Sequence, residues 1–213
     1  MAAVLFTPEE FTKLKKELVL FTCALKNMEM RVWTLLEEFQ NLQTYNPIEH
    51  VKTRMKSPES IADKLNRRGL EITAENARTQ LTDIAGIRCI CSYERDIITL
   101  ADIIKRQPDI KILRQRDYIQ SPKPSGYRSY HLIIEVPIYL AEQTERIPVE
   151  VQIRTQAMDF WAALEHKVRY KFNDNMPDNI IKNLWDCAEQ ISELDKQMFE
   201  IQNMAIEARG KEK

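Results

Sequence analysis

The sequence predicts an α/β domain held between two long helices. Strand-like runs alternate with helical segments in the middle of the chain, the strands at about 85–92, 110–118, 128–137 and 147–154 and the helices at about 95–106 and 156–172. Near both ends of the chain, apolar residues recur at alternating steps of three and four, which is typical of long helices. Such a pattern favours a sheet covered by helices. We therefore expect a central domain at 46–172, an N-terminal helical extension at 1–45 and a C-terminal helical extension at 173–213.

The first long helix is expected to begin at Thr7-Pro8-Glu9-Glu10, which offers a capping hydroxyl, a proline at the first helical position and two acids. Its apolar positions form a heptad repeat at Phe11, Leu14, Leu18, Phe21, Leu25, Met28, Val32, Leu35, Phe39 and Leu42. The C-terminal segment has the same repeat at Ile180, Leu184, Cys187, Ile191, Leu194, Met198, Ile201 and Ala205. Heptad seams need apolar partners, so we expect a homo-oligomer. The alternative is that both helices pack only within one chain.

Asn46-Pro47 ends the first helix, and we expect a second helix over 47–68, restarted at Ser57-Pro58-Glu59. Four polar residues in this stretch follow i, i+4, i+8 and i+11 spacing, which predicts one shared helical face: Lys56, Ser60, Lys64 and Arg67. Such a face suits a polyphosphate. The alternative is a solvated charged face.

The strand at 147–154 has one polar side. Val149, Val151 and Ile153 fall on one face because strand side chains alternate. The other face carries three polar residues: Glu150, Gln152 and Arg154. A buried strand in an α/β sheet is normally apolar on both faces. The polar side therefore indicates either a ligand-facing surface or an ordinary exposed face of the sheet.

A similar pattern surrounds residue 83. Asp83 stands just before the strand at about 85–92, in which Arg88 faces away from Ile87 and Cys89. Mg²⁺ is commonly held by one or two carboxylates together with substrate phosphates. Asp83 and Glu150 are therefore the candidate ligands for Mg²⁺.

The segment 120–126 is the clearest loop of the chain, with two prolines, two serines, one glycine and Lys123. Tyr127 and Arg128 follow it directly. Tyr127 could stack on a base, and the cations could bind phosphates. The alternative is a polar surface turn with a packed tyrosine.

Composition limits the class of protein. The chain has 213 residues, of which 44% are hydrophobic and 30% charged, and its net charge is −1. The basic residues concentrate at 52–68 and 105–128, which favours a local anionic ligand over a whole face for nucleic acid. Without a Cys-x-x-Cys pair, a structural zinc site is not expected. With neither a signal peptide nor an apolar run of about 20 residues, we expect a cytoplasmic protein without a membrane span.

Four ordered blocks resemble the small alarmone synthetases of the RelA/SpoT superfamily: NPIEHVKTRMKSPESIADKL, DIAGIRCIC, RDYIQSPKPSGYRSYHLIIEVP and VEVQIRTQAMDFWAALEHK. They cover roughly residues 46–172, and the opening block and the Pro-Lys-Pro-Ser-Gly loop look most like the RelP type. The resemblance implies a nucleotidyltransferase-like mixed sheet flanked by helices. It also implies transfer of pyrophosphate from ATP to the 3′-hydroxyl of GDP or GTP. The products would be AMP and (p)ppGpp, the alarmone of the stringent response.

The resemblance also implies roles for individual residues. On the ATP side, Arg54 and Arg88 would enclose the adenine, and Lys56, Ser60, Lys64 and Arg67 would contact the phosphates. Asp83 and Glu150 would be the catalytic carboxylates and would hold Mg²⁺. On the acceptor side, Tyr127 would stack on guanine, and Arg116, Lys123 and His131 would surround the phosphates and ribose. Gln152 and Arg154 would support the site.

Asp159 departs from members that have Asn at this position. A carboxylate can accept hydrogen bonds from both N1–H and the exocyclic amine of guanine, so we still expect Asp159 to bind the acceptor.

Long members of the superfamily add a hydrolase domain with a His-Asp motif. The chain has no His-Asp pair, so we expect synthesis without hydrolysis. The family suggests a homotetramer. Three other readings stay open: an RNA-binding module that uses Tyr127, a transferase that moves AMP instead of pyrophosphate, and an inactive helical scaffold.

Overall fold

The computed structural model describes residues 5–172 and 176–210, and it places a five-stranded sheet at the centre of the chain. In chain order, the elements are α1 (Pro8–Leu42), β1 (Ile48–Met55), α2 (Pro58–Arg67), α3 (Ala74–Gln80), β2 (Ala85–Cys91), α4 (Glu94–Lys105), β3 (Lys111–Asp117), β4 (Tyr130–Tyr139), β5 (Thr144–Thr155), α5 (Gln156–Lys171) and α6 (Asp178–Gly210). The strand order is β1-β2-β5-β4-β3, with β2 and β5 parallel and the other pairs antiparallel. The expected mixed sheet flanked by long terminal helices is confirmed.

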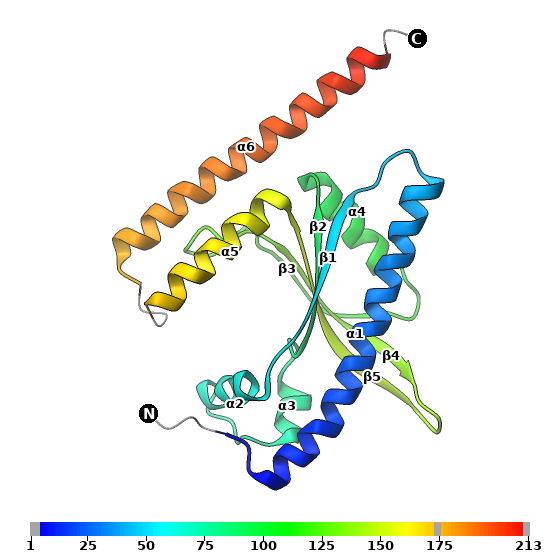
Figure 1. Cartoon of the computed structure of the whole chain (residues 1–213), viewed down its shortest axis with the longest axis vertical. Coiled ribbons are helices and arrows are strands. Elements are labelled where there is room, and N and C mark those ends of the chain that lie inside the picture. The colour runs from blue at the N-terminus through cyan, green and yellow to red at the C-terminus, as the bar shows by residue number, and fades with distance from the viewer. Residues whose placement is uncertain (1–4, 173–175, 211–213) are drawn as a thin grey trace.

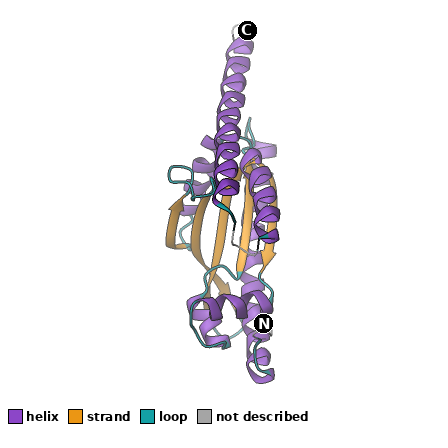
Figure 2. Ribbon diagram, turned by 90° about the vertical axis from the view of Figure 1, so that its left-hand side faces the viewer, coloured by secondary structure: helices purple, strands orange, loops and turns teal. Residues whose placement is uncertain are grey.

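The two faces of the sheet are covered unequally (Figure 1). α1 and α4 lie on one face, where the apolar sides of β2 and β5 are buried, including Ile87, Val149 and Val151. α5 covers part of the other face, and α6 packs outside α5 and then extends beyond the sheet (Figure 2). The polar side chains of β2 and β5 therefore face a surface that the helices leave partly open.

α1 packs within the chain. Thr7 caps the helix by accepting a hydrogen bond from the Glu10 amide, as its sequence predicts. The seam residues Leu14, Phe21 and Met28 are fully buried against the sheet. The heptad repeat of α1 therefore mainly faces the core of its own chain. This is the alternative to oligomer formation that the sequence left open for this helix.

The seam of α6 is only partly buried. Leu194 and Ile201 are each 56% exposed, although they continue the same repeat.

Among the described residues, no helix is apolar enough over a sufficient length to cross a bilayer.

The expected helix over 47–68 is wrong in its first half. Residues 48–55 form β1, an edge strand, and α2 starts only at Pro58. Ser57 caps α2, and the residue before a proline favours an extended backbone, so the chain cannot run helically through this point. The short helix α3 was not predicted at all.

Candidate active site

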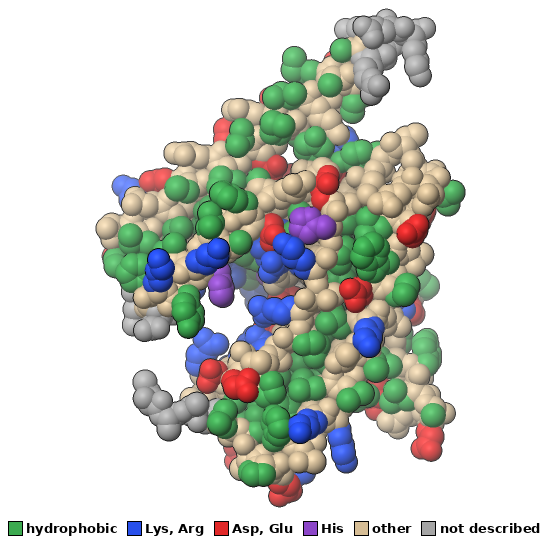
Figure 3. All heavy atoms as spheres, viewed as in Figure 1, with side chains coloured by type: hydrophobic (Ala, Val, Ile, Leu, Met, Phe, Trp, Pro, Cys, Tyr) green, Lys and Arg blue, Asp and Glu red, His purple; other side chains and the backbone are tan. Residues whose placement is uncertain are grey.

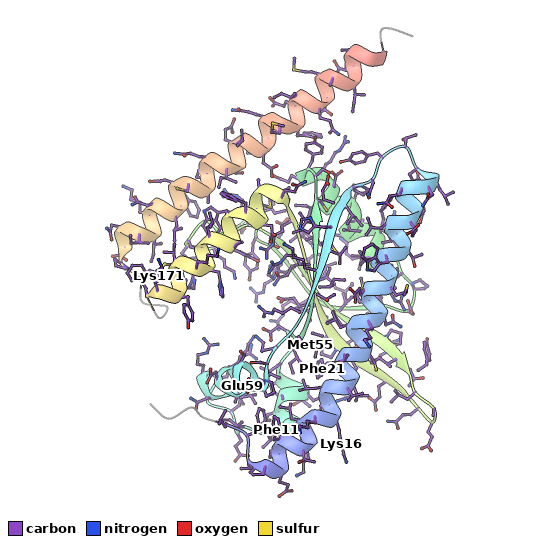
Figure 4. The ribbon with its side chains drawn as sticks, in the orientation of Figure 1. Phe11, Lys16, Phe21, Met55, Glu59 and Lys171 are labelled. Carbon is purple, nitrogen blue, oxygen red and sulfur yellow. The ribbon has the colours of Figure 1, made fainter. Side chains whose placement is uncertain are left out.

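A cavity of about 640 Å³ lies on the partly open face of the sheet, where α5 and α2 stand on opposite sides (Figure 3). Lys, Arg and His side chains gather around this hollow. In Figure 4, Lys171 of α5 and Glu59 of α2 mark its two sides. Nine of the expected site residues line it: Arg54, Asp83, Arg88, Lys123, Tyr127, His131, Glu150, Gln152 and Arg154. We call this space the central cavity.

Asp83 lies just before β2, and its two carboxylate oxygens have different surroundings. Oδ2 is 3.1 Å from Lys56 Nζ and 2.5 Å from Lys64 Nζ. Oδ1 is buried and has no hydrogen-bond partner among the described residues. Burial raises the pKa of Asp83, but the hydrogen bond and charge of Lys64 and the charge of Lys56 outweigh it and lower the pKa below its usual value. Asp83 is therefore ionised, with one oxygen left for a further ligand.

Glu150 lies on β5, in register with Gly86 of β2. Its Oε1 is 3.2 Å from His131 Nδ1, and its Oε2 accepts a hydrogen bond of 3.0 Å from Gln152. Burial and the charge of Asp83 raise the pKa of Glu150, but the hydrogen bond and charge of His131 and the hydrogen bond from Gln152 together outweigh them, and the net pKa is lowered. Glu150 and Asp83 line the same central cavity. Two carboxylates distant in the chain therefore border the same cavity on one side of the sheet.

Tyr127 joins the loop at 120–126 to the sheet. Its hydroxyl lies 2.9 Å from His131 Nε2 and accepts a 2.9 Å hydrogen bond from Arg154. The ammonium of Lys123 stands over its ring, 4.6 Å from the centroid. Burial raises the pKa of Tyr127 and lowers that of Lys123. The hydroxyl end of Tyr127 is held by the sheet, while its ring borders the central cavity.

Asp159 stands in the first turn of α5, which Thr155 caps. Its carboxylate pairs with Arg88 at 3.1 Å and with Arg154 and Lys52 at 3.4 Å. The carboxylate is thus surrounded by three cationic side chains.

The cations of the β1–α2 region divide between two further cavities. One cavity, of about 420 Å³, is lined by Arg54, Lys56, Ser57, Ser60, Asp63 and Arg67. The other, of about 180 Å³, contains Lys64, Arg116, Lys123 and His131 beside Asp83 and Glu150. Lys64 turns to Asp83, and Lys56 precedes α2. The expected single helical face of four residues is therefore wrong, because Lys56 lies outside the helix.

Several lining residues were missed by the sequence reasoning. Arg68, Arg114 and Tyr118 border the smaller cavity, and Glu165, His166 and Arg169 of α5 border the central cavity. The charged stretch at 105–128 was a signal for Arg114, while nothing local distinguishes the α5 residues from a solvated helix. Arg128, noted above as a cation of the loop, forms an ion pair with Glu189 of α6 instead of lining the central cavity.

Comparisons with known proteins agree with this geometry. Residues 53–175, more than half of the chain, match the family model described as a region found in RelA / SpoT proteins. The GTP pyrophosphokinase YwaC of Bacillus subtilis is 44% identical over 88% of this chain and 89% of its own length.

Solved structures show the same relationship. Small alarmone synthetase 2 of B. subtilis is 42% identical with a TM-score of 0.80, covering 89% of this chain and 98% of its own. Small alarmone synthetase 1 of the same organism, solved with its product pppGpp, is 34% identical with a TM-score of 0.82, covering 89% and 96%. Another structure of synthetase 1, bound to AMPCPP, is 30% identical with a TM-score of 0.75, covering 91% and 97%. The higher identity to synthetase 2 agrees with the expected RelP type. The chain belongs to the RelA/SpoT family, as one of its small alarmone synthetases.

Proposed function

We propose that this protein transfers the pyrophosphate group of ATP to the 3′-hydroxyl of GDP or GTP and releases AMP. One observation carries the proposal: the carboxylates of Asp83 and Glu150 line a single cavity whose borders are rich in cations. The related synthetase 1 binds pppGpp and AMPCPP, and the relative YwaC is a GTP pyrophosphokinase.

In this scheme, ATP lies along β1 and α2. Arg54 and Arg88 enclose its adenine, and Ser60, Arg67 and Lys56 contact its phosphates from the cavity of about 420 Å³. Lys64 acts next to Asp83. Attack at the β-phosphorus requires the triphosphate to be held in one pose, and fixed cations supply that positioning and neutralise charge.

The acceptor lies on the Tyr127 side. Its guanine stacks on Tyr127 and meets Asp159, and its phosphates and ribose reach Arg116, Lys123 and His131. The ammonium of Lys123 now stands over one face of the Tyr127 ring, so a base that stacks on that face displaces it. The acceptor 3′-oxygen then bonds to the β-phosphorus of ATP. The bond from that phosphorus to the oxygen that bridges the α- and β-phosphates breaks, and this oxygen leaves as part of AMP.

The proton of the 3′-hydroxyl has a nearby acceptor in Glu150. The lowered pKa of Glu150 keeps the carboxylate ionised at neutral pH but also makes it a weak base. We therefore assign Glu150 chiefly to orienting the hydroxyl, with Gln152 and His131 holding the carboxylate in place.

The residues present fit Mg²⁺. Mg²⁺ prefers hard oxygen ligands and is often bound by one or two carboxylates plus phosphates. Asp83 offers a buried oxygen without a partner among the described residues, and Glu150 offers a second ionised carboxylate in the same cavity. When bound, the ion would neutralise charge on the phosphates of ATP.

Incubation of the protein with Mg²⁺, ATP labelled in its γ-phosphate and either GDP or GTP tests the proposal. Pyrophosphate transfer puts the label into a guanosine product and releases unlabelled AMP. Transfer of AMP would instead release labelled pyrophosphate and would contradict the proposal. Prolonged incubation tests the expected lack of hydrolysis, because the labelled product should persist.

The exposed seam of α6 supports the expected homo-oligomer, with the homotetramer as its specific form. Light scattering after size-exclusion chromatography would measure its mass, and a monomer would contradict the expectation. Nucleotide substrates also agree with the expected cytoplasmic location.

A further inference from the structure

The helix α6 contacts the segment that carries Tyr127, although α6 itself lies outside the central cavity. Two hydrogen bonds tie α6 to the β5–α5 corner: Trp161 Nε1 donates to the Leu184 carbonyl at 3.1 Å, and Thr155 Oγ1 donates to Asp195 at 2.6 Å. The side chain of Ala188 is buried at this junction. α6 is therefore docked at a defined position beside the loop that precedes β4.

The contact with the loop leaves no room for a side chain at residue 126. Gly126 has a φ of +91°, and a Cβ added there would lie 2.5 Å from Ala188 Cβ and 3.2 Å from Trp185 Cα. Real Cβ atoms do not approach other heavy atoms this closely, and L residues avoid this φ. The backbone at Gly126 thus rests directly on α6.

A second contact holds the other side of Tyr127. Arg128 donates to Glu189 Oε1 at 2.7 Å and to the Ala188 carbonyl at 3.5 Å. The side chain of Arg128 is only 12% exposed, so the pair is shielded on that side. Both neighbours of Tyr127 in the chain are therefore fixed by one short segment of α6, residues 185–189.

We propose that Ala188 and Glu189 are positioning residues, which set the place of Tyr127 and through it the affinity for the guanine acceptor. The inference rests on the proposed function, in which the base stacks on Tyr127. With its two chain neighbours seated on α6, Tyr127 directs its side chain to the central cavity, where its hydroxyl meets His131 and Arg154. Pre-ordering a binding group lowers the entropy lost on binding.

The proposal predicts a selective kinetic effect. The residues assigned to the phosphates of ATP come from the end of β1 and from α2, and α2 lies far from α6 in the fold (Figure 1). A change at the α6 contact should therefore raise the KM for GDP or GTP and leave the KM for ATP nearly unchanged. General unfolding would instead lower the active fraction and leave both KM values unchanged.

A double-mutant cycle tests the contact. Gly126→Ala should raise the acceptor KM by roughly tenfold or more, since the added Cβ meets Ala188 and tenfold corresponds to about 1.4 kcal/mol. Ala188→Gly removes the atom that is met at 2.5 Å, so the double variant should recover part of the affinity. Gly69→Ala is the matched control, because Gly69 has a φ of +67° but no heavy atom within 4 Å of the added Cβ.

The cycle separates contact from backbone strain. If Gly126→Ala acts only through its φ, Ala188→Gly will restore nothing, and that result would overturn the proposal. An unchanged acceptor KM in Gly126→Ala, or an equal rise in Gly69→Ala, would overturn it as well.

A milder pair of variants covers the case in which Gly126→Ala does not fold. Glu189 is 51% exposed, so Glu189→Ala should fold and break only the pair with Arg128. It should raise the acceptor KM, whereas Glu193→Ala, another exposed glutamate of α6, should leave it unchanged. Equal acceptor KM values in these two variants would contradict a positioning role for Glu189.

Hydrogen exchange without nucleotide keeps this inference separate from the proposed function. The Gly126 amide donates to the Lys123 carbonyl at 2.8 Å, and the Lys123 amide donates to the Tyr127 carbonyl at 3.2 Å. Both amides should exchange faster in Glu189→Ala than in Glu193→Ala. If the wild-type protein makes no guanosine product, the proposed function fails, but this comparison still tests the contact. Equal exchange in the two variants would overturn the proposal.

Discussion

Replacement of Glu150 by glutamine removes one negative charge from the centre of the cavity and keeps the shape of the side chain. In the structure, Glu150 faces His131 at 3.2 Å and accepts a hydrogen bond from Gln152 at 3.0 Å. An amide oxygen can keep one of these contacts, so we expect the fold to persist. Misplacement of a nucleophile costs roughly 10²-fold in rate, and loss of a general base costs roughly 10²–10⁴-fold. With tenfold worth about 1.4 kcal/mol, turnover should fall by the equivalent of about 3–5 kcal/mol.

The assay is the rate of transfer of γ-labelled pyrophosphate from ATP to GDP at saturating substrates. Glu135→Gln serves as the control, since Glu135 lies on the neighbouring strand β4 and pairs with Lys111. The control should turn over like the wild type, with both melting temperatures within a few degrees of it. A folded Glu150→Gln variant with turnover close to that of the control would refute the assignment of Glu150.

The pH profile tests the ionisation of Glu150. Its pKa is lowered from the ordinary 4.5 in the free protein. The carboxylate is therefore already ionised in either role, so kcat/KM should show no acidic limb due to Glu150 between about pH 6 and 8. An acidic limb in that range that disappears in Glu150→Gln would show that Glu150 titrates there and would contradict the lowered pKa.

Three further changes have definite expected outcomes. Asp83→Asn should raise the Mg²⁺ concentration needed for half-maximal turnover, and an unchanged Mg²⁺ titration would contradict its role as a ligand. Tyr127→Ala should raise the acceptor KM by about 5- to 150-fold, for a stacking energy of about 1–3 kcal/mol, whereas Tyr127→Phe should retain most of the affinity; equal KM values in the two variants would argue against stacking. Burial raises the pKa of Asp195 above the ordinary 3.8 despite the hydrogen bond from Thr155. The folded state then binds this proton more tightly than the unfolded chain, and stability falls as the pH rises through the folded pKa. Asp195→Asn should therefore raise the melting temperature at pH 7, with a gain that shrinks toward pH 4, and a gain independent of pH would contradict this reasoning.

The central sheet could be predicted because its strands carry strong local signals. Alternation along β5 separated Val149 and Val151 from Glu150 and Gln152, and the structure buries the first pair and turns the second to the cavity. The strand β1 could not be recognised in the same way. It is an edge strand in which only Ile48 is buried, so it lacks the apolar alternation of a covered strand.

The spacing of four polar residues led to the wrong helix prediction for the same part of the chain, residues 47–68. Lys56, Ser60, Lys64 and Arg67 have helical intervals, but a common interval does not show that one helix contains all four. The signal that should have decided was Ser57-Pro58, a cap followed by a proline at the first helical position. It places Lys56 before the helix, where its ammonium reaches Asp83 from the end of β1.

The two heptad seams show why sequence pattern alone leaves the site incomplete. Both helices repeat apolar residues at the same interval, but Phe21 of α1 is fully buried while Leu194 of α6 is 56% exposed. The interval predicts that a helix has an apolar face, but it does not predict which surface packs against that face. The contact of α6 with the loop that precedes Tyr127 depends on Ala188, a small residue outside the repeat that lets Gly126 come close. A small residue such as Ala188 indicates a close contact only when the backbone packed against it is known. The sequence of residues 180–205 alone therefore could not predict the contact between this helix and the segment that carries Tyr127.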